Sequence, residues 1–101
     1  MRTCTVELGD ILQLAEDIHD IVKWMESEYC RRINTNSLEI MSIIEDLISG
    51  PGPNPTEEEC VDIMNEIDDL NNAIIEDAET CHPDVLPLAE QIQALCARWI
   101  E

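Results

Sequence analysis

Carboxylates dominate the residues of this chain that could do chemistry. Of its 101 residues, 23 are Asp or Glu and only 5 are Lys or Arg, which gives a formal net charge of −18. No carboxylate stands in an apolar stretch that would tune its pKa for acid–base catalysis. The chain also has no Gly-rich phosphate loop and no nucleophile elbow. We therefore expect a non-enzymatic protein that needs no cofactor.

The densest acidic run is residues 56–80, with ten carboxylates and no Lys or Arg. Ile63, Ile67, Leu70 and Ile74 recur there with the 4-3-4 spacing of one face of a helix. Polar residues with the same spacing lie on the opposite face. These residues and their neighbours are the predicted partner-binding surface: Glu58, Asp62, Asn65, Glu66, Asp69, Asn72, Glu76, Asp77 and Glu79.

This charge favours a basic protein as the partner. A small domain needs a net charge of only about 2 to 8 for solubility, and the excess here opposes compaction. Direct binding to nucleic acid or to an anionic membrane is disfavoured for the same reason. Carboxylates along one helix face lie about 5–6 Å apart, within a factor of two of the phosphate repeat in a nucleic-acid strand. The leading hypothesis is a nucleic-acid mimic that occupies a basic surface of a nucleic-acid-handling protein.

Histidine and cysteine could bind a metal, but their placement does not favour it. Glu16–His19 and Glu79–His82 each have the Glu-x-x-His spacing, which is half of the ligand signature of di-iron helical bundles. Both glutamates fall on polar helix faces, so no metal site is expected. Five cysteines without a Cys-x-x-Cys pair predict no disulfide framework, which indicates a reducing cytoplasm. We expect Cys60, Cys81 and Cys96 to be buried as small apolar residues. Cys4 and Cys30 are the candidates for a reactive thiol.

Periodicity and capping signals predict one all-α domain over residues 1–101. The expected helices are residues 6–32, 37–49, 56–80 and a fourth that begins after Asp84. A connector at 34–37 precedes the second helix, and the breaker segment at 49–55, with Gly50 and Pro51, follows it. Thr56 and Glu59 form a capping box at the third. Short connections favour a small antiparallel bundle of about four helices.

The second helix is expected to be short and very apolar. Apolar residues cover more than half of its circumference, which predicts a central position or a homodimer interface made of Leu38, Ile40, Met41, Ile43, Ile44, Leu47 and Ile48. An alternative function follows, in which residues 38–48 bind a partner and the protein is a dimeric helical adaptor or assembly factor.

The segment Asn36-Ser37-Leu38-Glu39 resembles the Asp-Ser-Leu attachment site of acyl carrier proteins, which are also small, acidic and helical. The resemblance covers about a dozen residues and implies a phosphopantetheine arm on Ser37, although Asn36 replaces the aspartate. In size, acidity and helical content the chain also resembles phage anti-restriction and anti-CRISPR inhibitors, bacterial immunity proteins and antitoxins. The N-terminal residues lack an apolar signal region and no run approaches the length of a membrane span, so a cytoplasmic location is expected.

Overall fold

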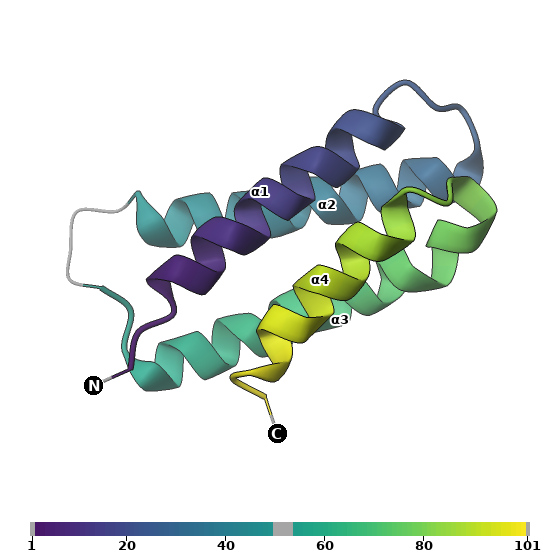
Figure 1. The fold of residues 1–101 in the computed structure, drawn as a ribbon. Helices are drawn as coiled ribbons and strands as arrows, with labels where there is room; N and C mark the ends of the chain where they lie inside the picture. Colours follow the sequence, from purple (N-terminus) through teal and green to yellow (C-terminus); the bar gives the residue numbers. More distant parts are fainter. Residues whose placement is uncertain (1, 50–53, 101) are drawn as a thin grey trace.

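The computed structural model describes residues 2–49 and 54–100, and they form a bundle of four α-helices (Figure 1). The helices are α1 (Thr5–Val22), α2 (Glu28–Ile48), α3 (Glu57–Cys81) and α4 (Val85–Ala97). Each helix packs against the next one in sequence, and α4 packs back against α1. The prediction of an all-α bundle is therefore confirmed. Within these described ranges, no helix combines the length and the apolar character needed to cross a membrane.

Aliphatic side chains fill the centre of the bundle. The chain has no Phe, and Trp99, at 6% exposure, is the only aromatic residue in the core of the described ranges. All four helices contribute large, fully buried side chains, which include Leu8, Ile11, Ile18, Ile33, Ile40, Ile44, Met64, Ile67, Ile74 and Ile92. Close packing of these branched residues fixes the relative positions of the helices.

The longest helix, α3, begins with the predicted capping box. The hydroxyl of Thr56 accepts a hydrogen bond from the Glu59 amide at 3.1 Å, and the Glu59 carboxylate accepts one from the Thr56 amide at 3.1 Å. These bonds satisfy two amides that the helix itself leaves without partners. The buried face of α3 consists of Cys60, Met64, Ile67, Asn71, Ile74 and Ala78. The predicted core residues Ile63 and Leu70 lie half-buried at the edge of this face.

The predicted boundary between the first two helices is wrong. We expected a helix over residues 6–32, whereas α1 ends at Val22 and α2 begins at Glu28. Ser27 starts α2, because its hydroxyl accepts a hydrogen bond from the Tyr29 amide at 3.2 Å. Residues 23–27 contain neither Gly nor Pro, so the usual markers of a turn are missing there. The second helix is consequently 21 residues long, with a polar first half, and is neither short nor uniformly apolar.

The predicted connector at residues 34–37 lies inside α2 because its polar side chains find partners there. Thr35 Oγ1 donates to the Arg31 carbonyl at 3.1 Å, and Ser37 Oγ donates to the Asn34 carbonyl at 3.0 Å. Such local bonds satisfy Ser and Thr within a helix. The predicted helix end at Gly50 and Pro51 lies outside the described residues.

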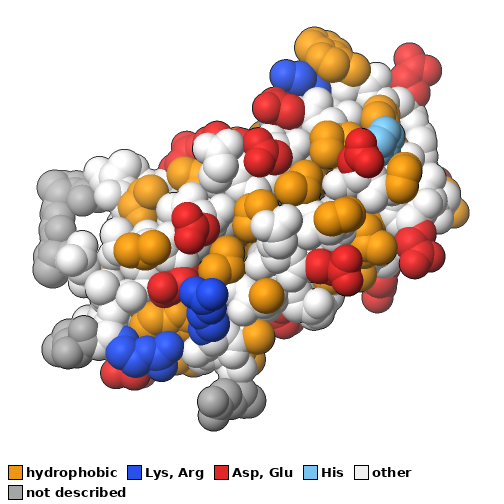
Figure 2. Space-filling model, in the orientation of Figure 1, with side chains coloured by type: hydrophobic (Ala, Val, Ile, Leu, Met, Phe, Trp, Pro, Cys, Tyr) orange, Lys and Arg blue, Asp and Glu red, His pale blue; other side chains and the backbone are white. Residues whose placement is uncertain are grey.

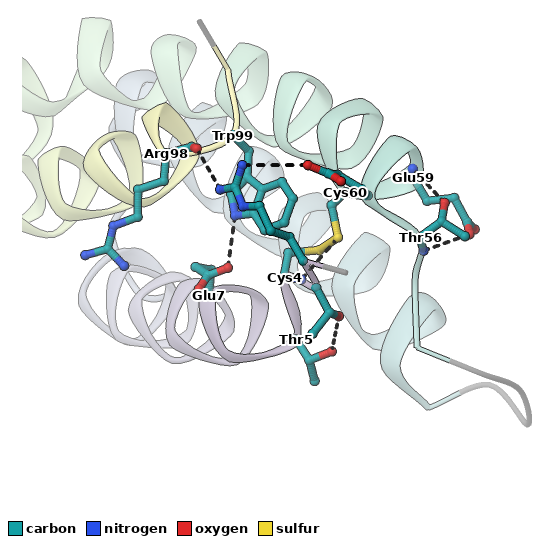
Figure 3. Close-up of a disulfide and its surroundings, with 11 residues drawn as sticks. Cys4, Thr5, Glu7, Thr56, Glu59, Cys60, Arg98 and Trp99 are labelled. Atoms are coloured by element: carbon teal, nitrogen blue, oxygen red, sulfur yellow. Dashed lines mark hydrogen bonds and ion pairs between the residues drawn. A yellow bond between two sulfur atoms is a disulfide. The ribbon is translucent and has the colours of Figure 1, made fainter.

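Two disulfides cross-link the bundle, which contradicts the expectation of free thiols. Cys4 pairs with Cys60 (Figure 3), and Cys30 pairs with Cys81. The bonds join residues 56 and 51 positions apart. Closing loops of that length in the unfolded chain corresponds to about 4 kcal/mol for each bond taken alone. Because the two loops overlap in sequence, the second bond adds less than the first. The odd cysteine, Cys96, is free and buried.

One polar side chain is buried in the α3–α4 contact. Asn71 is fully buried, and its Nδ2 donates to the Ala89 carbonyl at 2.8 Å. Its Oδ1 has no hydrogen-bond partner among the described residues. An unpaired buried acceptor of this kind costs about 1–3 kcal/mol. Asn71 therefore aligns α3 with α4 through one hydrogen bond, at the expense of stability.

We predict that Asn71→Leu leaves the free energy of unfolding unchanged or raises it by up to about 1 kcal/mol, because it removes the unpaired acceptor. Asn71→Asp is expected to lower it by about 3 kcal/mol or more at pH 7, because it buries an unpaired charge. Urea denaturation measures both changes. Asn72→Leu, at the exposed neighbouring position, is the matched control and is expected to have a small effect. A loss above about 2 kcal/mol for Asn71→Leu would contradict a net cost of the unpaired acceptor.

Candidate protein-binding surface

The predicted polar face of α3 is fully exposed along its length. We call the following residues the acidic stripe, all of which are exposed: Glu58, Asp62, Asn65, Asp69, Asn72, Glu76 and Glu79. Each stands two positions before a residue of the buried face or before Cys81, so the two faces point about 160° apart. At a rise of about 1.5 Å per residue the acidic stripe is about 32 Å long. Glu66, also exposed, flanks it.

Few cations approach this surface. Arg2 lies 3.9 Å from Glu57 at the first turn of α3, and both side chains are more than half exposed. The stripe carboxylates and Glu66 make no ion pair with any residue that the structure describes. The two amide side chains are held locally, since Asn65 Nδ2 donates to the Val61 carbonyl at 3.0 Å and Asn72 Nδ2 lies 3.5 Å from Asp68. The stripe therefore presents uncompensated negative charge on a regular helix.

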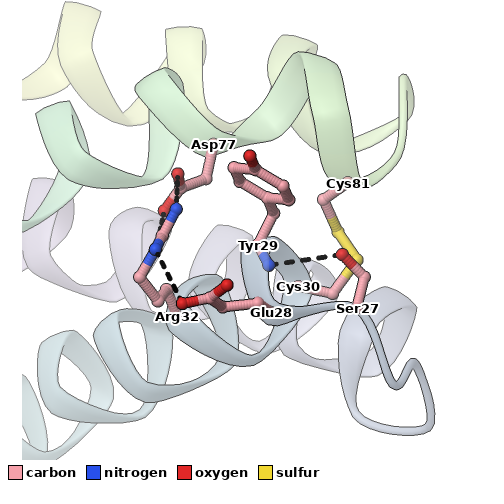
Figure 4. A network of polar contacts seen from close by, with 7 residues as sticks. All are labelled: Ser27, Glu28, Tyr29, Cys30, Arg32, Asp77 and Cys81. Carbon is pink, nitrogen blue, oxygen red and sulfur yellow. Dashed lines mark hydrogen bonds and ion pairs between the residues drawn. A yellow bond between two sulfur atoms is a disulfide. The ribbon is translucent and has the colours of Figure 1, made fainter.

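Asp77, which was predicted together with the exposed residues of α3, is not part of their exposed face. Its side chain is only 13% exposed and faces α2. Arg32 holds it with two hydrogen bonds, of 2.9 and 3.1 Å, in a bidentate arrangement (Figure 4). Donating to the Asp77 carboxylate raises the pKa of the Arg32 guanidinium above its ordinary value. Arg32 also lies 3.4 Å from Glu28 and stacks 4.9 Å from the centroid of the Tyr29 ring. Asp77 is thus a structural contact between α2 and α3.

Most of the predicted dimer interface on α2 lies inside the protein. Ile40 and Ile44 are fully buried in the core, and Met41 and Leu47 are half-buried against it. Ile43 is half-buried as well. Only Leu38 and Ile48 are substantially exposed, at 43% and 41%. The apolar circumference arises because α2 contacts both α1 and α3.

Ser37 does not have the position that the carrier-protein resemblance implies. It lies in the middle of α2, fully buried, and its hydroxyl is bonded to the Asn34 carbonyl. A phosphopantetheine arm needs an exposed hydroxyl near a helix start. The predicted helix start at this serine is therefore wrong, and its hydroxyl is not accessible for attachment.

The histidine pairs and the free cysteine have structural roles. His19 Nδ1 is hydrogen-bonded to Asn34 Oδ1, and His82 Nδ1 accepts from the Asp84 amide at 3.1 Å. No three potential metal ligands gather anywhere in residues 2–49 or 54–100. Burial, with a smaller effect of the Asp68 charge, raises the pKa of the Cys96 thiol to about 12. Cys96 is consequently a poor nucleophile. Cys4 and Cys30, the candidates for a reactive thiol, are disulfide-bonded.

Apolar surface is also exposed outside α3. Trp24, in the α1–α2 loop, is 85% exposed, and Lys23 Nζ lies 5.9 Å from its ring centroid. Between α1 and α4 an open hollow of about 450 Å³ has Leu14 and Leu95 among its lining residues. Figure 2 shows the α1–α4 face, where hydrophobic side chains alternate with acidic ones.

Comparison with known proteins gives no relative, since no family model, no curated protein and no solved structure matches this chain.

We predict that added salt stabilises the protein. Like charges three or four residues apart occur five times among the exposed carboxylates of 58–79, and each such pair costs about 0.2–0.5 kcal/mol. Raising NaCl from about 0.01 M to about 0.5 M shortens the screening length severalfold. The melting temperature should rise by about 5–10 °C. Choline chloride, measured beside NaCl, should have the same effect, because screening does not depend on cation identity. A flat response would show that the repulsion is already relieved.

Proposed function

We propose that the chain is a non-enzymatic acidic binding protein, built on an antiparallel bundle, that occupies a basic surface of a partner protein. The version that we favour is a nucleic-acid mimic, with the acidic stripe of α3 in a groove that otherwise holds a phosphate backbone. The observation that carries the proposal is the exposure of every stripe residue on a helix without Lys or Arg.

Energetics and geometry support this proposal. A rigid helix holds its carboxylates at fixed spacing, so little conformational entropy is lost when they bind. Complementary charge speeds association and selects a basic partner over other proteins. Neutralising the stripe would also relieve the repulsion within α3. Charge that opposes folding in the free protein thus becomes favourable in the complex.

The test is a charge reversal on the stripe, Asp62→Lys with Asp69→Lys and Glu76→Lys. Tagged protein is exposed to an extract of its host and to the surrounding medium, and retained proteins are identified by mass. The wild type is expected to retain a basic protein at low salt and release it at high salt. The stripe variant should bind at least about 100-fold more weakly, because each carboxylate becomes a repulsive contact.

The matched control is the triple variant Asp10→Lys, Asp20→Lys and Glu26→Lys, which changes the net charge equally. All three residues are exposed and lie on α1 or in the α1–α2 loop, away from α3. It should retain the same protein nearly as well as the wild type. If both triple variants lose binding equally, total charge and not the stripe drives association. Unchanged binding of the stripe variant would rule out the mimic.

The second candidate is a helical adaptor that binds through apolar side chains. The exposure of Leu38 and Ile48 on α2, and of Trp24 near the other end of the bundle, favours it. Exposed Trp residues are frequent anchors of protein interfaces. In this version the charge serves solubility, and a second copy of the chain is one of the possible partners.

This adaptor hypothesis predicts a complex that survives high salt, since apolar contacts are not screened. The double variant Leu38→Ser and Ile48→Ser should then lose the partner and keep its melting temperature within a few degrees, because neither residue belongs to the core. Binding that persists in this variant and disappears in the stripe variant would favour the mimic.

A further inference from the structure

Each disulfide has one of its cysteines on α3, and the two cysteines lie at opposite ends of that helix. Cys60 lies in the first turn of α3 and is bonded to Cys4, the residue before α1. Cys81 is the last residue of α3 and is bonded to Cys30 in the first turn of α2. The acidic stripe, except Glu58, lies between the two attachment points. The helix with ten carboxylates and no basic residue is thus the one that is cross-linked at both ends.

The first cross-link is shielded from solvent. Cys4 and Cys60 are fully buried, and the Cys4 amide lies 3.2 Å from Cys60 Sγ. Trp99 lies beside them (Figure 3), with its Nε1 bonded to Glu7 at 2.9 Å. Arg2 stacks 3.9 Å from the centroid of the Trp99 ring. An external thiolate must displace these side chains before it can attack a sulfur atom.

The second cross-link is more accessible. Cys30 is buried, whereas Cys81 is half-buried at the end of α3, where the chain turns into the His82–Asp84 loop. Ser27, just before α2, and Tyr29, in its first turn, lie nearby (Figure 4), and Tyr29 is 40% exposed. A limiting amount of reductant should therefore open Cys30–Cys81 before Cys4–Cys60.

The fifth cysteine cannot compete for the other four. Cys96 is fully buried in α4, and its raised pKa leaves almost no thiolate near neutral pH. Disulfide exchange requires a thiolate with access to a sulfur atom. The odd cysteine, which argued against disulfides in the sequence, is therefore compatible with two stable pairs.

We infer that the chain matures in an oxidising compartment, where Cys4–Cys60 and Cys30–Cys81 form as structural disulfides that fasten α3 at both ends, and that it meets its partner there. Each pair forms by thiol–disulfide exchange, in which two thiols give two electrons and two protons to a disulfide-bonded oxidant that becomes a dithiol. A reducing cytoplasm would keep the thiols free. The statement about the partner rests on the proposed function, whereas the state of the cysteines does not.

The first test counts thiols in the protein as its host makes it. Cells and medium are quenched with acid, the protein is denatured, and free thiols are labelled with a maleimide of known mass. Intact mass should show one label, on Cys96, before reduction and five after it. Five labels before reduction would overturn the inference. Three would do so as well, because α3 would then be fastened at one end only.

The second test asks whether the disulfides hold α3. Hydrogen exchange of the α3 amides is compared in the oxidised protein, the reduced protein and the variants Cys4→Ala/Cys60→Ala and Cys30→Ala/Cys81→Ala. Loss of a bond should speed exchange at the end of α3 it fastens by at least about tenfold at low salt, and by less at high salt. Cys96→Ala, which keeps both bonds, is the control for loss of a buried sulfur. Equal protection of α3 in all forms would overturn the role assigned to the disulfides.

These results are separable from the proposed function. If the stripe variant binds as well as the wild type, the mimic is wrong, but one free thiol and a disulfide-dependent α3 would still place the chain in an oxidising compartment. If the thiols are all free and the stripe variant fails to bind, the compartment is wrong and the mimic stands.

Discussion

Electrostatic repulsion within α3 is the constraint around which the rest of the structure is arranged. Its carboxylates follow one another without a basic residue on the same helix, and an isolated helix of this kind would be weak. Tertiary contacts supply what the helix lacks. One face is buried along its whole length, a capping box starts it, Arg32 holds it from α2, and a disulfide fastens each end. The helix whose charge most opposes folding is thus held by several kinds of stabilising contact.

Different sides of α3 make different contacts, and these contacts determine which of its carboxylates are exposed. The sides that meet α2 and α4 hold Asp77 in its pair with Arg32 and Asn71 in its bond to α4. The outer side holds the acidic stripe, whose carboxylates form no ion pair with a described residue. Sequence spacing alone assigns Asp77 and its neighbour Glu76 to the same charged surface. The bundle separates them, since Asp77 pairs with Arg32 of α2 and Glu76 remains exposed.

A surface of this kind has two properties that a flexible acidic tail lacks. The carboxylates keep a regular spacing over about 32 Å, and the backbone beneath them is anchored by the core and the cross-links. A flexible tail would lose conformational entropy on binding, whereas a fixed helix loses little. Cys96, on α4, remains a thiol for a different reason. It needs no partner because burial suppresses its reactivity.

The sequence by itself determined the features that depend on local physics. Helical periodicity and the Thr56–Glu59 capping box located α3 almost to the residue, and the 4-3-4 spacing separated its acidic stripe from its core face. Tertiary structure decided the rest. Local sequence favoured a turn at the polar segment 34–37, but hydrogen bonds to backbone carbonyls of α2 satisfy its side chains within the helix. The contacts of α2 with two neighbours buried Ile40 and Ile44, which periodicity had offered as a dimer interface. Cysteine pairing depends on which helix ends meet in space, and neither the number nor the spacing of the cysteines contains that information.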